Sequence, residues 1–144
     1  MIRVAQSGIL LGALGMMITF VGLFPGVIAI PPTPGFGIGQ ILTVTIGLAT
    51  LILGALVYVK FKFFARKNLT LTQQIAIRIS YTGLTFAALV AMADVLGFGS
   101  NLRSGGEDEF LGPIQLTGIL INFGVAAVGV ILFALAGDPE VIEE

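Results

Sequence analysis

Long apolar runs alternate with short polar segments along the 144-residue chain. Each run is close to or above the ~20 residues that an α-helix needs to cross a bilayer. The runs are continuous and do not alternate with a period of two, as the strands of a membrane β-barrel would. We therefore predict an all-α integral membrane protein, a single domain over residues 1–144, with four transmembrane helices near residues 6–24, 40–59, 75–99 and 114–136.

Composition agrees with this pattern. Hydrophobic residues make up 56% of the chain and charged residues 10%, with a mean hydropathy of +1.06. A soluble domain carries about 25% charged residues, so this chain cannot cover a water-facing surface. The net charge of −1 gives no basic field that would attract nucleic acid.

The residue types that are absent narrow the chemistry. The chain has no His, Cys or Trp. This removes histidine-ligated haem and pigment sites, iron–sulfur and zinc sites, disulfides, and Ser/His or Cys/His catalysis. Nucleotide-binding and zinc-protease motifs are absent too. We predict no enzyme activity, no cofactor and no metal site; a membrane enzyme that acts on lipid is the weakest alternative.

Basic residues predict the orientation. They crowd the connection between the second and third runs and the start of the chain, and the positive-inside rule places such segments in the cytoplasm. Both termini are then cytoplasmic, in a prokaryotic cytoplasmic (inner) membrane. Lysine and arginine alternate with phenylalanine in this connection, a pattern typical of an anchor to anionic lipid. The cytoplasmic anchor comprises Arg3, Lys60, Lys62, Arg66, Lys67 and Arg78.

An offset of 75 residues aligns the chain with itself. Residues 2–58 then show 11 identities, whereas composition alone gives roughly 5. Polar landmarks stay in register, since Arg3 falls on Arg78 and Gln40 on Gln115. The offset predicts two tandem helical hairpins, residues 1–64 and 75–137, followed by a short acidic tail, 138–144. The alternative is that unrelated helical hairpins in lipid resemble one another.

Small residues recur along the predicted helices, at spacings of three or four in the first and third of them. In lipid, helices associate through close backbone approach, which small residues permit. We predict that these positions pack helix against helix inside one chain; a face for self-association or for a partner subunit is the alternative. The positions are Gly8, Gly12, Gly15, Gly47, Gly54, Gly83, Ala87, Ala91, Gly124 and Gly129.

Two polar residues within the apolar runs are candidate functional groups. Asp94 lies five residues before Gly99, about 7 Å from the outer end of the third run. We predict an interfacial role with Arg103 as its first partner; proton or cation handling is the alternative. Asn122 lies near the middle of the fourth run, where an interhelical hydrogen bond is expected.

The two outer connections differ in character. Residues 100–114 carry three adjacent carboxylates, at 107–109, without the spacing of a calcium loop, so a solvated surface is expected. The first connection is apolar, rich in proline and uncharged. We predict that its apolar side chains are buried in the membrane interface or against a partner. These residues are Val27, Ile28, Ile30, Pro31, Pro32 and Pro34.

Together these features favour a non-catalytic small integral-membrane subunit, a scaffold or accessory protein of a larger membrane assembly. Its partners would be membrane lipid and other membrane-protein subunits, or further copies of the chain. The alternative is a small oligomeric channel, or a proton- or cation-coupled transporter that uses Asp94. The polar residues are too few for a water-filled path through one chain.

Overall fold

The computed structural model describes residues 2–28, 37–66, 68–93, 96 and 113–137. Within them the chain is all-helical, with no strand. Four helices are long and apolar enough to cross a membrane, which confirms this part of the sequence prediction for the residues that are described. The elements are α1 (Ile2–Leu23), the 3-10 turn η1 (Pro25–Ile28), α2 (Ile38–Phe63), α3 (Leu71–Ala91) and α4 (Pro113–Leu135).

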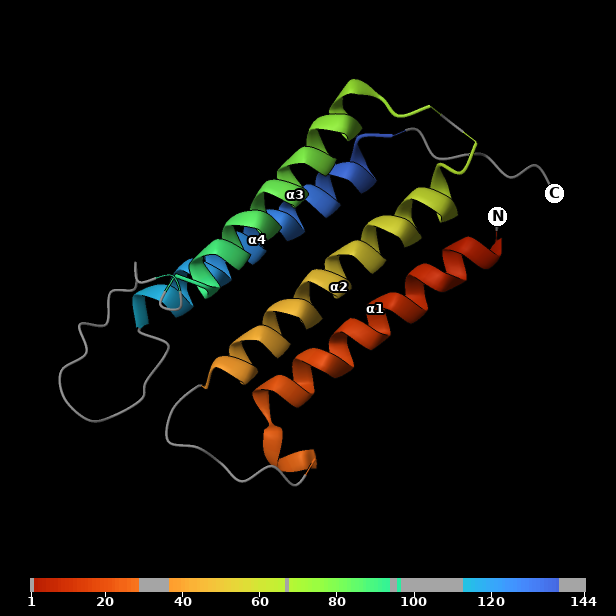
Figure 1. The fold of residues 1–144 in the computed structure, drawn as a ribbon. Helices are drawn as coiled ribbons and strands as arrows, with labels where there is room; N and C mark the ends of the chain where they lie inside the picture. The colour runs from red at the N-terminus through yellow and green to blue at the C-terminus, as the bar shows by residue number, and fades with distance from the viewer. Residues whose placement is uncertain (1, 29–36, 67, 94–95, 97–112, 138–144) are drawn as a thin grey trace, which may run out of the picture.

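The four helices run side by side, and successive helices point in opposite directions (Figure 1). α1 lies along α2, and α3 lies along α4. α1 begins, α2 ends and α3 begins at one end of the bundle, which holds Arg3, Lys60, Lys62 and Arg66. We call this the basic end and the opposite one the far end. Helices of 21 to 26 residues are about 32 to 39 Å long, enough for a ~30 Å hydrocarbon layer.

Helix boundaries depart from the apolar runs at the basic end. α2 continues through Lys60 and Lys62 to Phe63, because a lysine near a helix end can keep its charge in water while its stem stays on the helix. The Lys60 ammonium donates to the Phe64 carbonyl oxygen at 2.9 Å and so satisfies a carbonyl just past the helix.

α3 begins four residues before the predicted run because its first turn is capped. The Thr70 hydroxyl oxygen accepts a bond from the Gln73 N–H, and the Gln73 side-chain oxygen accepts one from the Thr70 N–H, both at 3.2 Å. This reciprocal capping box stabilises a polar first turn. At the far end, α3 stops at Ala91, whereas the apolar run continues to Gly99.

The buried core joins α2 to the α3–α4 pair. One cluster near the basic end contains Ile52 and Leu56 of α2, with Phe64 beside Phe133. The two rings meet edge to face with centroids 6.0 Å apart, a favoured aromatic geometry. A second cluster near the far end comprises Ile41, Ala87, Ala91, Ile119 and Phe123. α1 enters neither cluster, so it is a peripheral helix that rests on α2.

Candidate functional site

Glycines bring the backbones of α1 and α2 together. A Cβ atom added at Gly8 would lie 2.9 Å from the Tyr58 Cα, and one added at Gly54 would lie 2.8 Å from the Gly12 Cα. A Cβ at Gly15 would meet the backbones of Leu51 and Gly47 in the same way. The contact therefore requires glycine, because any side chain at these three positions would hold the helices apart.

Gly12 and Gly124 differ from the other small residues. A Cβ at Gly12 would have only the Leu51 Cδ1 within 4 Å, at 3.8 Å. The backbone of Gly12 nevertheless lies directly against Gly54. Gly124 is exposed and has nothing within 4 Å of its added Cβ, so it packs against no described residue. The open space at Gly124 has a geometric reason. Ala126 faces α3, and a residue two positions away is turned by about 200° on the helix.

The α3–α4 contact combines small residues with hydrogen bonds. A Cβ at Gly83 would lie 3.1 Å from the Ala126 Cα, and one at Gly129 would meet Ser80 and Ala76. The Ser80 hydroxyl, fully buried, donates to the Ala126 carbonyl oxygen at 3.0 Å. Nearer the basic end, two further side chains of the α3 region donate to carbonyl oxygens at the end of α4 and just beyond it: Gln73 to Phe133 at 3.5 Å, and Thr70 to Ala136 at 3.2 Å.

The two helix pairs differ in register by seven residues. In the first pair Gly54 meets Gly12 and Gly8. If the second pair repeated these contacts at the offset of 75, Gly129 would meet residues 87 and 83. Instead, Gly129 meets Ser80 and Ala76. The register of α3 and α4 thus does not follow the ungapped repeat. The connections differ by the same amount, because 15 positions separate Leu23 from Ile38 and 22 separate Ala91 from Pro113.

Among the described residues, the Asn122 side chain makes no hydrogen bond to another helix. Its side-chain amide donates to the Gly118 carbonyl oxygen at 2.8 Å, within α4 itself. Its backbone oxygen, in contrast, lies against Gly83 of α3. Several threonines also bond within their own helix, as Thr19 does to the Gly15 carbonyl oxygen at 2.8 Å. These groups are satisfied locally, which suits side chains in an apolar surrounding.

Asp94 and its suggested partner Arg103 lie outside the described residues. The structure shows only that Asp94 follows the last residue of α3, Ala91, by three positions. In the part of the chain that is described, the space between α2, α3 and α4 is filled by the apolar clusters given above. A channel or transporter that uses Asp94 stays a prediction.

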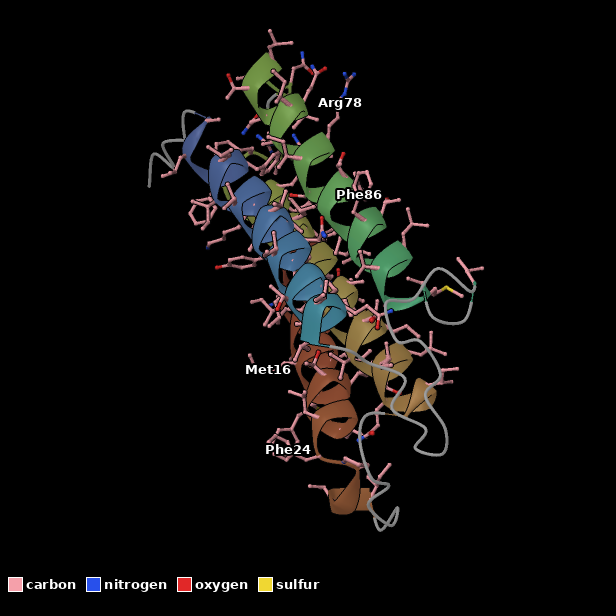
Figure 2. The ribbon with its side chains drawn as sticks, turned by 90° about the vertical axis from the view of Figure 1, so that its left-hand side faces the viewer. Met16, Phe24, Arg78 and Phe86 are labelled. Carbon is pink, nitrogen blue, oxygen red and sulfur yellow. The ribbon has the colours of Figure 1, made fainter. Side chains whose placement is uncertain are left out.

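The anchor residues gather toward the basic end. Arg3, Lys62, Arg66 and Arg78 are exposed, and Figure 2 shows Arg78 at the side of α3 that faces away from the other helices. Aromatic residues flank the cations in the sequence, since Tyr58 precedes Lys60 and Phe63 follows Lys62. The Tyr58 and Phe63 ring centroids lie 6.3 Å apart. Lys67 lies outside the described residues. Cations interleaved with aromatic rings suit the headgroup region of a membrane.

The first connection exposes apolar side chains where it is described. Val27 is 63% exposed and Ile28 52% exposed in η1, next to an exposed Phe24. Figure 2 shows Phe24 at the far end of α1, beyond Met16. The other residues predicted for this surface, Ile30, Pro31, Pro32 and Pro34, lie outside the described residues.

Sequence reasoning missed the polar side chains that join α3 to α4. Gln73 and Ser80 are almost completely buried. The first could have been found, because threonine followed three residues later by glutamine signals a capping box. Ser80 gives no such signal. No group of three or more metal-binding side chains occurs among the described residues.

The chain matches no family model, no curated protein and no solved structure.

Proposed function

We propose that this protein is a non-catalytic small integral-membrane subunit, a scaffold or accessory protein that packs against a larger membrane assembly. The apolar surface at the far end of α1 supports the proposal best. α1 has 22 residues and is about 33 Å long, so it already crosses a ~30 Å hydrocarbon layer. Phe24, Val27 and Ile28 come after it and are exposed.

Exposed apolar side chains beyond the hydrocarbon layer favour contact with another surface. Removing apolar area from water contributes about 25 cal/mol for each Å², and contiguous apolar surface outside the bilayer is typical of interaction sites. α1 is also the helix with the fewest buried residues, 17% of its apolar window against 28% for the others. A partner that covers η1 could therefore approach along α1 without disturbing the core.

The proposal includes an orientation. We infer that the basic end faces the cytoplasm of a prokaryotic cell and that both termini lie on that side. Exposed Arg3, Lys62, Arg66 and Arg78 support this orientation, because positive charge is retained on the cytoplasmic side during insertion. Anionic lipid headgroups would be their counter-ions.

We also propose that the two hairpins arose by duplication, followed by a change of seven residues in the far-end connection. Two observations support this form. Gly15 and Gly83 occupy corresponding places against their partner helices, as do Gly54 and Gly129. A seven-residue difference also separates the two connections. The identities between residues 2–22 and 77–97 follow the offset of 75, whereas the contacts of Gly15 and Gly83 correspond at an offset of 68.

The subunit hypothesis is tested by purifying the protein from its native membrane in a mild detergent. We expect a second membrane protein to copurify in a fixed ratio. The variant in which Val27→Ser and Ile28→Ser are combined should lose that protein, because the apolar surface is gone. Leu96→Ser is the matched control, since Leu96 is 54% exposed and lies beyond α3 at the far end.

Two outcomes would count against the hypothesis. One is a wild-type protein that migrates as a single chain with no second protein bound. The other is a partner that is retained equally by the double variant and by Leu96→Ser. Loss of the partner from both variants would assign the contact to the whole far end and not to η1.

A further inference from the structure

A narrow apolar groove lies between α1 and α4, with α2 as its floor. Its volume is about 230 Å³. Leu23 of α1 lines one side, Leu116 and Leu120 of α4 line the other, and the floor is formed by Ile41, Val44 and Leu48 of α2. Among the described residues, no charged side chain lines it. The groove therefore favours a purely hydrocarbon occupant.

The dimensions of the groove select a thin occupant. The floor extends from Ile41 to Leu48, seven residues, or about 10 Å along the helix. A volume of about 230 Å³ over that length gives a space for atom centres roughly 5 Å wide, or about 8 Å between the walls once a ~1.4 Å radius is added on each side. An α-helix with its side chains is about 10–12 Å across, so a helix of a second copy or of a partner subunit is too wide. A single hydrocarbon chain is narrow enough.

The volume also sets the length of chain that fits. An apolar cavity of ~150 Å³ holds one benzene molecule, six carbons. By that measure the groove, at about 230 Å³, holds roughly nine carbons, and nine extended carbons span about the 10 Å of the floor. Volume and length therefore agree on one extended chain segment.

The depth of the groove matches one leaflet. Ile41 and Leu48 lie three and ten residues from the first residue of α2, Ile38, or about 4 and 15 Å below the far end. Half of a ~30 Å hydrocarbon layer is about 15 Å. The groove is thus parallel to, and at the level of, the acyl chains of the far-end leaflet.

We propose that the groove binds one acyl chain of a phospholipid from the far-end leaflet. The bound chain contacts both α1 and α4, which otherwise do not pack closely on each other, so it fills the space that separates the peripheral helix from the α3–α4 pair. This site is independent of the subunit hypothesis, because it needs no second protein.

The test measures lipid retained by the purified protein. Wild-type protein is reconstituted into vesicles of phosphatidylethanolamine and phosphatidylglycerol, extracted in mild detergent and analysed by native mass spectrometry. We expect one phospholipid per chain to persist. Leu120→Trp fills the groove and should lower retention at least fivefold. Ile121→Trp is the matched control: Ile121 is 61% exposed and Leu120 58%, yet Ile121 does not line the groove.

A second groove-filling variant protects the test against misfolding. Thr45→Phe fills the groove from α2, and each variant is accepted only if its helical circular dichroism matches that of the wild type. Loss of lipid in both filling variants, with retention in Ile121→Trp, supports the site. Equal retention in all variants, no lipid on the wild type, or a bound isoprenoid quinone or second copy in place of phospholipid would overturn it.

Discussion

Replacing Gly54 with alanine would put a methyl group between the backbones of α1 and α2. The new carbon would lie 2.8 Å from both the Gly12 Cα and the Gly8 carbonyl oxygen, whereas ordinary contact begins at 3.4 Å. The Gly12 N would lie closer still, so α1 would have to move away by more than about 0.6 Å at this point. Overpacking of this kind costs about 1–3 kcal/mol, which lowers the folding equilibrium roughly 5- to 150-fold.

Gly12→Ala is the control for this variant. It replaces a glycine at the same level of the bundle, but its Cβ would find only the flexible end of Leu51, 3.8 Å away. Both substitutions gain about the same helix propensity, ~1 kcal/mol, so the difference between the two variants isolates packing. We expect Gly54→Ala to be less stable than Gly12→Ala by about 1–3 kcal/mol.

The assay is reversible unfolding in mixed micelles, with increasing sodium dodecyl sulfate and circular dichroism as the signal. Each variant is compared with the wild type at the same detergent composition. If Gly12→Ala is as destabilised as Gly54→Ala, or more so, the helices do not meet in this register and the reasoning fails.

Three further predictions use the same assay. Gly129→Ala should be less stable than Gly124→Ala by about 1–3 kcal/mol, since its Cβ would meet the Ser80 hydroxyl and backbone. Gly124→Ala, with open space around its Cβ, should keep the helix-propensity gain of ~1 kcal/mol; equal effects would contradict the α4 orientation. Ser80→Ala removes the 3.0 Å bond to α4 and should cost about 0.6 to 2 kcal/mol. Ser80→Thr keeps the hydroxyl but adds a methyl group. A smaller loss in Ser80→Thr than in Ser80→Ala would show that the hydrogen bond contributes more to stability than the tight packing around residue 80. Phe133→Ala, at a ring that is 1% exposed, should cost about 3–5 kcal/mol, and Leu135→Ala, at a side chain that is 78% exposed, much less; similar losses would argue against the core near the basic end.

The four helices that are long and apolar enough to cross a membrane follow from the sequence because their cause is local. A helix satisfies its own backbone hydrogen bonds, so any apolar run of sufficient length forms one in lipid. The boundaries were less accurate where polar residues extend a helix. α2 continues to Phe63 and α3 begins at Leu71, since a lysine stem and a capping box stabilise turns that no hydropathy pattern reveals.

Only the tertiary structure decided which turn of each helix meets which. A shift of seven residues is almost two full turns, so it keeps every small residue on the same face. The sequence could therefore indicate that Gly83 and Gly129 belong to an interface, but not that Gly129 meets Ser80 and Gly83 meets Ala126. Periodicity determines the face of a helix, and contacts along its length, set by backbone approach and by the Ser80 bond, determine the register.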